Sequence, residues 1–161
     1  VAWSAADTIA ALAAWRNEES MYAAMARTQP RNATGPVGLA LTRVERGDEA
    51  GAWEALASAA AIDSTRYEIP LYRAGILLRR GEAEAARALA VEAGTRVGWN
   101  RDARLIEALA LQRLGRWPDA RVVLNDLRAR APGDPEVAAA WRSQLAGEPP
   151  AAHPTRAVPR R

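Results

Sequence analysis

The sequence of 161 residues contains no cysteine, no phenylalanine and no lysine, and its one histidine is His153. Without cysteine there is no disulfide and no thiolate metal ligand, and the redox compartment is left open. The common nucleophiles and bases reduce to serine, the carboxylates and this histidine. No GxSxG motif surrounds a serine, and no glycine-rich loop suited to phosphate is present. We therefore expect no catalytic site, no metal site and no cofactor.

Positive charge is present but is not concentrated in the body of the chain. The formal net charge is +3. The stretch 147–161 carries Arg156, Arg160 and Arg161 against Glu148, which leaves +1 for the remainder, where both signs are mixed. Proteins that bind nucleic acid usually gather their basic residues on one face or arm. We expect no nucleic-acid partner.

The composition favours helices throughout. Alanine, leucine, arginine and glutamate are abundant and β-branched residues are few, so we expect an all-α fold. The stretch 1–14 is mostly apolar, but it includes Asp7 and is too short to cross a bilayer. No basic segment before it indicates a signal peptide. A membrane contact is expected only through a region that precedes Val1 in a longer protein.

Glycine recurs with a fixed period. Gly47, Gly81 and Gly115 lie 34 residues apart, a period typical of helix–turn–helix repeats. Small or apolar residues share their phase, at Ala40, Ala74, Ala108, Ala52, Ala86, Ala120, Leu56, Ala90, Leu124, Ala59, Ala93 and Leu127. Glycine permits the left-handed turn that closes a helix, and small residues let two helices approach closely. The pattern predicts antiparallel helix pairs.

Helix ends can be predicted from residues of the same phase. Asn32, Asn100 and Asp134 are expected to cap the first helix that follows each of them. Pro36 falls in a first turn, where its missing N–H costs little. Pro70 is expected to lie slightly deeper, and therefore to make its helix start late or bend.

The third copy carries the clearest family signature, in Ala108, Leu111, Gly115, Trp117, Ala120, Leu124, Leu127 and Pro132. These residues resemble the tetratricopeptide repeat family. The resemblance implies an α-solenoid of antiparallel helix pairs, with repeats at 33–66, 67–100 and 101–134. Stretch 1–32 is expected to hold a helical segment and a degenerate half-repeat, and 135–146 a capping helix. Stretch 147–161, rich in proline, is expected to be disordered.

The resemblance also implies a binding groove, because the first helices of this family line its concave surface. The corresponding residues here are Val37, Leu41, Val44, Leu71, Tyr72, Leu78, Arg79, Leu105, Leu109, Gln112 and Arg113. The predicted groove is mainly apolar, with Arg79 and Arg113 at one edge. An apolar groove suits an amphipathic helix or an extended peptide. The alternative is that these residues pack against neighbouring helices.

One subtype of the family is excluded by residue type. Co-chaperones of this family that hold the C-terminal carboxylate of heat-shock chaperones use Lys, Asn and Arg in the groove. The matching positions here are Val37, Leu41, Tyr72, Asp102 and Ile106. The carboxylate clamp is therefore absent, and a different protein or peptide partner is expected.

Two alternative functions remain open. The stretches 14–22 and 30–33 are similar to the junction between the last membrane helix and the repeat domain of polytopic glycosyltransferases of the protein O-mannosyltransferase type. That would make the chain a non-catalytic extracytoplasmic domain that docks acceptor proteins; otherwise we expect a cytoplasmic protein. The second alternative is self-association through Trp53, Trp99 or an uncapped N-terminal face, which leaves the oligomeric state open.

Overall fold

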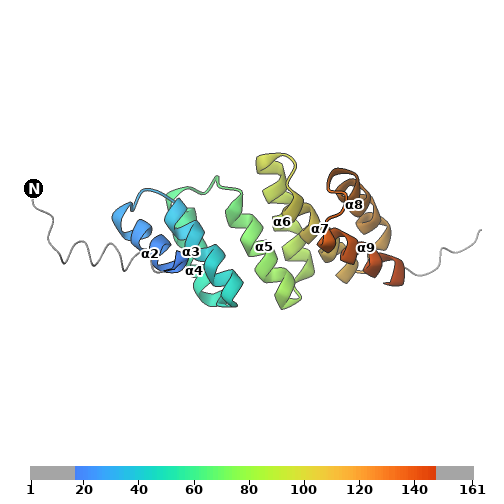
Figure 1. Cartoon of the computed structure of the whole chain (residues 1–161), viewed down its shortest axis with the longest axis horizontal. Coiled ribbons are helices and arrows are strands. Elements are labelled where there is room, and N and C mark those ends of the chain that lie inside the picture. The colour runs from blue at the N-terminus through green and yellow to red at the C-terminus, as the bar shows by residue number, and fades with distance from the viewer. Residues whose placement is uncertain (1–16, 148–161) are drawn as a thin grey trace, which may run out of the picture.

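The structure is a computed structural model, which describes residues 17–147. Within that range the chain is entirely helical, with no strand. The helices follow one another along a single row (Figure 1). Their bounds are α2 Glu18–Thr28, α3 Thr34–Arg46, α4 Glu49–Ile62, α5 Glu68–Arg80, α6 Ala83–Val97, α7 Arg101–Arg113, α8 Trp117–Arg130 and α9 Pro135–Gly147.

The helices form two layers that differ in spacing. Each helix packs against the next one in sequence, as expected for antiparallel hairpins with short turns. The first helices of the pairs also touch one another, α3 with α5, α5 with α7, and α7 with α9. Within residues 17–147, no Cα atom of α4 lies within 8 Å of one in α6, and no Cα atom of α6 lies within 8 Å of one in α8. The closely spaced layer of α3, α5, α7 and α9, here called the first-helix face, is therefore the inner side of the solenoid.

The periodic glycines make the predicted turns. Gly47, Gly81 and Gly115 have φ angles of +79°, +84° and +71°, a region that side chains with a Cβ rarely adopt. Gly47 and Gly81 each directly follow a first helix, and their N–H groups bond the last carbonyls of that helix. The sharp return of the chain after each first helix follows from this geometry.

The predicted capping residues are mostly confirmed. Asn100 accepts a hydrogen bond from the Ala103 N–H at 2.9 Å, and Asp134 accepts from the Val137 N–H at 3.1 Å. Asn32 instead accepts from the Thr34 N–H at 2.9 Å, while Ala33 holds the N-cap position.

The two prolines of the first helices take the same place. Pro36 and Pro70 are each the third residue of a helix, so the prediction that Pro70 lies deeper is wrong. The N–H groups of a first turn have no partner within the helix, so proline removes no bond there. With a period of 34 residues, α3 and α5 start at equivalent positions, and α7 starts one residue earlier. The start of α5 is therefore late relative to α7, as predicted.

The core consists of the small and apolar columns. The periodic alanines 40, 74, 108, 52, 86 and 120 are completely buried, as are Leu56 and Leu124. Helices α2 and α3 approach still more closely, because a Cβ at Gly35 would lie 2.6 Å from the Ala26 backbone nitrogen. Helix α2 nevertheless has no buried residue, so the N-terminal end is the more open end of the described solenoid.

Some predictions about the ends of the chain cannot be compared with the structure. Residues 1–16 and 148–161, which include most of the predicted tail and His153, lie outside the described residues. The division into repeats at 33–66, 67–100 and 101–134 stays a prediction. Among residues 17–147, no helix is both long and apolar enough to cross a membrane.

Candidate binding face

The predicted groove residues differ in their accessibility. Leu41, Val44, Tyr72 and Leu109 are half-buried, and Arg79 and Arg113 are exposed. The remaining five are buried, with exposed fractions of 6–8%: Val37, Leu71, Leu78, Leu105 and Gln112. The four apolar residues of this set pack into the core clusters between neighbouring helices. Their main contribution to a groove is therefore to form its floor.

A hollow on the first-helix face lies between α7 and α9. Its volume is about 380 Å³, and its lining includes Leu105, Leu109, Glu136, Ala139 and Ser143. A second hollow of about 240 Å³ continues from Leu109 and Ser143 toward Arg113 and Trp117. The structure therefore brings together the four groove residues predicted on α7. The predicted residues of α3 and α5 line neither hollow.

Helix α9 supplies four of the six residues that line the larger hollow, a contribution that the sequence analysis missed. Glu136, Ala139, Ala140 and Ser143 all belong to α9, which was interpreted only as a cap. The signal was available, because α9 follows α8 at the position of a fourth first helix. A helix in that position extends the first-helix face as well as covering the core.

Gln112 holds α9 in place. Its side-chain amide donates hydrogen bonds to the Ala140 carbonyl at 2.9 Å and to Gln144 Oε1 at 3.1 Å. Gln144 is fully buried and donates to the Trp117 carbonyl at 2.9 Å. Buried amides of this kind are costly to leave unsatisfied, so the three helices α7, α8 and α9 are tied to one arrangement.

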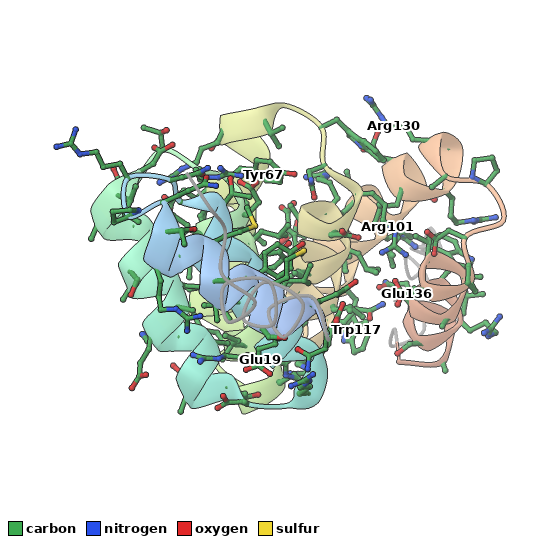
Figure 2. The ribbon with its side chains drawn as sticks, turned by 60° about the vertical axis from the view of Figure 1, so that its left-hand side comes forward. Glu19, Tyr67, Arg101, Trp117, Arg130 and Glu136 are labelled. Carbon is green, nitrogen blue, oxygen red and sulfur yellow. The ribbon has the colours of Figure 1, made fainter. Side chains whose placement is uncertain are left out.

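Arg101 makes a second connection between α7 and α9. Its guanidinium bonds Asp134 at 2.7–2.8 Å and Glu136 at 2.5 Å, and Figure 2 shows Arg101 and Glu136 side by side. This guanidinium, with the backbone N–H groups at the start of α9, lowers the pKa of Asp134 to about 2. The carboxylate of Asp134 is ionised across the neutral range, and its pair with Arg101 ties the start of α9 to the start of α7.

The two arginines predicted at the groove edge are not equivalent. Arg79 pairs with Glu49 at 3.0 Å, and Arg80 pairs with the same carboxylate. Hydrogen bonds from both guanidinium groups lower the pKa of Glu49. Arg113 forms no ion pair or hydrogen bond with the described residues, and it lines the hollow. Arg113 is therefore the cation of the two that a ligand carboxylate can reach without displacing another.

Tyr72 contributes a neutral hydroxyl to the same face. Burial, followed by the nearby charge of Glu68, raises the pKa of Tyr72 to about 12. The phenol therefore stays protonated at neutral pH and can both donate and accept a hydrogen bond.

Among the described residues, no group of three or more His, Asp or Glu side chains is arranged to hold a metal ion.

Two layers of antiparallel helix pairs, closed by left-handed glycines at a 34-residue period, define an all-α solenoid of the tetratricopeptide type. No family model matches the sequence, and no curated protein matches it. Solved structures show the same fold. The second tetratricopeptide domain of human RPAP3, solved in complex with the HSP70 peptide SGPTIEEVD, is 17% identical, with a TM-score of 0.59 over 79% of this chain and 98% of that one.

A second solved structure, that of MamA, is 16% identical to this chain, with a TM-score of 0.63. The likeness covers 92% of this chain and 96% of MamA. The fold predicted from the repeat pattern is therefore confirmed.

Proposed function

We propose that the chain is a protein–protein interaction module that binds a helical or extended segment on the first-helix face. The observation that carries the proposal is the hollow between α7 and α9, where apolar Leu105 and Leu109 adjoin the unpaired Arg113. A mainly apolar hollow with one unpaired charge selects an amphipathic segment, because the apolar side supplies affinity and the charge sets its orientation.

The solved neighbour supports this function at the level of the fold. The RPAP3 domain holds a nine-residue peptide, so a solenoid of this shape can accept a short segment. This chain carries Val37, Tyr72 and Asp102 at clamp positions, and none of these side chains supplies a cation for a carboxylate. We therefore expect its partner to offer an apolar residue to Leu109 and an acidic residue to Arg113.

A pair of adjacent alanines on α9 gives a matched test. Ala139 lines the hollow of the first-helix face, while Ala138 lines a hollow on the other side of α9. Both are exposed, so an arginine at either position leaves the core unchanged. Peptides selected on the full chain from a displayed library should lose affinity for Ala139→Arg by at least about tenfold and bind Ala138→Arg normally.

The role of Arg113 can be tested with the same peptides. Arg113→Gln should weaken peptides that contain an acidic residue, since a charge-assisted bond is lost. Fluorescence anisotropy of a labelled peptide measures both effects. Failure to enrich any peptide, or equal affinity for the two alanine variants, would refute binding at this hollow.

The interpretation as an accessory domain of a membrane glycosyltransferase stays a prediction of the sequence. It depends on the region that precedes Val1 in a longer protein. Several hydrophobic spans directly upstream would support it, and a start codon close to Val1 would exclude it.

A further inference from the structure

Helix α9 is a first helix, and no described second helix follows it. It spans Pro135–Gly147, which is 34 residues after α7 at Arg101–Arg113, so each of its residues has a counterpart in α7. Helices α3, α5 and α7 each pack along the second helix that comes next in sequence. Helix α9 instead stands at the C-terminal end of the row of helices (Figure 1). The side of α9 that a second helix would cover is therefore open among residues 17–147.

Leu145 marks this open side. Leu77 of α5 and Leu111 of α7 occupy the same repeat position and are only 8% and 2% exposed. Each of them lies in a core cluster with residues of the following second helix, α6 or α8. Leu145 is 65% exposed. A leucine that belongs to the core in two repeats is thus left uncovered at the end of the described solenoid.

A hollow of about 640 Å³ adjoins the open side of α9. Its lining comes from α8, from the turn at 131–134 and from α9, where it includes Ala138, Trp141 and Arg142. Ala138, Arg142 and Leu145 lie four and three residues apart, so they share one helix face, here called the outer side of α9. A hollow of the same volume lies between α6 and α8, and α8 forms its far wall. No described helix forms the corresponding wall beside α9.

Two arginines on this surface have no carboxylate partner among residues 17–147. Arg142 forms no ion pair or hydrogen bond with these residues, and the Arg128 guanidinium lies over the Trp141 ring, 4.5 Å from its centroid. The acidic residue in the lining is Asp134, and its carboxylate is already bound by Arg101. The surface is therefore positive, and acidic groups complement it.

Arg142 also changes how a helix can approach α9. It stands at the repeat position of three completely buried alanines, Ala40, Ala74 and Ala108. A helix that packs on α9 meets a long cationic side chain there in place of a methyl group, so it must lie farther out than α8 lies from α7. An acidic residue on that helix can reach across the added distance and bind the guanidinium.

The sequence after α9 does not have this chemistry. Residues 148–161 contain prolines at 149, 150, 154 and 159, so no more than four consecutive residues lack one. A helix interior does not accept proline without kinking or breaking. The same stretch has three arginines against one glutamate, a net charge of +2, which is the sign of the surface itself. A complementary helix must therefore come from elsewhere.

We propose that the outer side of α9 binds an acidic amphipathic helix of a partner protein, which covers Leu145 with its apolar side and pairs with Arg142. The proposal goes beyond the peptide binding proposed above, because it uses a separate surface. Ala139 lines the hollow of the first-helix face, whereas Ala138 lines the one described here. Helix α9 then serves two binding surfaces, one on each side.

Two segments of this chain provide matched probes. Peptide 48–63 has the sequence of α4, a second helix, with four acidic residues and no basic residue. Peptide 116–131 has the sequence of α8, also a second helix, with four arginines against two aspartates. Both carry an apolar side that is buried in the folded chain. Because isolated helices of this length are only marginally stable in water, NMR titration of the isotope-labelled full chain is used, since it detects weak complexes and locates them.

The expected result is a preference for the acidic helix. Peptide 48–63 should shift the signals of Leu145 and of the Trp141 indole N–H, and should bind at least about tenfold more tightly than peptide 116–131. Arg142→Gln should reduce that preference, since a charge-assisted pair is lost. Leu145→Glu should weaken peptide 48–63 by at least about tenfold. Val122→Glu, at a residue that is 68% exposed on α8 and does not line this hollow, should leave its affinity unchanged.

The two surfaces of α9 can be tested separately. Ala139→Arg, which should block the first-helix face, should leave the affinity of peptide 48–63 unchanged. Leu145→Glu should likewise leave unchanged the affinity of peptides that Ala139→Arg weakens. Either proposal can therefore fail while the other stands.

Several results would overturn the proposal. They are the absence of shifts at Leu145 and Trp141 with peptide 48–63 at about 1 mM, equal affinity for the two peptides, and equal losses in Leu145→Glu and Val122→Glu. Deletion of residues 148–161 should not raise the affinity of peptide 48–63; a tenfold rise would identify that stretch as the occupant instead. Shifts at Leu145 that depend on the concentration of the chain alone would identify a second copy.

Discussion

The same substitution, glycine to alanine, should change stability in opposite directions at two first helices. At Gly35 of α3, an added Cβ would lie 2.6 Å from the Ala26 backbone nitrogen of α2. At Gly75 of α5, the only atom of the other described helices within 4 Å would be Ile106 Cδ1, at 3.9 Å. The first contact is a steric clash with backbone, and the second is ordinary packing.

The magnitudes follow from this geometry. Favourable contacts lie at about 3.5–4.0 Å, so α2 must move away by roughly 1 Å in Gly35→Ala. Overpacking of that kind costs about 1–3 kcal/mol, which exceeds the small gain from alanine in a first turn. In Gly75→Ala nothing opposes the gain in helix preference, and the free energy of unfolding should rise by about 0.5–1 kcal/mol.

Urea unfolding of the full chain, followed by far-ultraviolet circular dichroism, measures both changes. The slope of the free energy against urea should stay constant, so that the midpoint alone reports stability. Hydrogen exchange should show the loss in Gly35→Ala concentrated in α2 and α3. A shift in the same direction for both variants would refute the argument that the close approach of α2 requires glycine.

Three further predictions concern polar groups. Gln144→Met removes the hydrogen bond to the Trp117 carbonyl and an acceptor for the Gln112 amide, so the free energy of unfolding should fall by about 1–3 kcal/mol. Hydrogen exchange in α9 should become faster, and unchanged exchange would contradict the role of Gln144 in anchoring α9. Because the pKa of Asp134 is lowered from 3.8 to about 2, its pair with Arg101 stabilises the fold above pH ~4 and loses effect as the pH falls toward 2. In Asp134→Asn, the midpoint of urea unfolding should decrease less as the pH falls through this range, because the pair with Arg101 is already weakened. Because burial raises the pKa of Tyr72 from 10.0 to about 12, the unfolded chain loses this proton at a lower pH than the folded chain does. The free energy of unfolding should therefore fall as the pH rises between those two values. Tyr72→Phe should not show this fall in a spectrophotometric and urea titration.

The repeat architecture could be predicted because it depends on local backbone requirements. Gly47 and Gly81 must adopt positive φ, and the alanines seven residues before them must be small for two helices to touch. These constraints are visible in the residue types themselves. The period of the glycines therefore identified the helix pairs without knowledge of any contact.

The accessibility of the groove residues follows their repeat column, a signal that was not used. Val37, Leu71 and Leu105 share one column and are all buried, whereas Leu41 and Leu109 share another and are both half-buried. By contrast, the pairing of Arg79 with Glu49, 30 residues earlier, depends on the geometry between successive helix pairs, which the sequence pattern does not specify.

The exposed side of α8 shows another limit of sequence reasoning. Val122 lies one residue from the buried Val123 on α8, and residue type alone does not tell them apart. Helical periodicity would have placed Val122 outside the buried stripe of Ala120, Val123 and Leu127. That signal was available but was not used.

The order of contacts along the solenoid has a consequence for how the chain folds and for how helix pairs can be added or removed. Every helix contact among residues 17–147 joins helices that are adjacent or next but one in sequence. No step needs the two ends to meet, so little loop entropy opposes folding, and folding should be fast. Structure can begin at any helix pair and spread to its neighbours. For the same reason, a whole pair can be gained or lost by duplication or deletion while the remaining pairs keep their contacts.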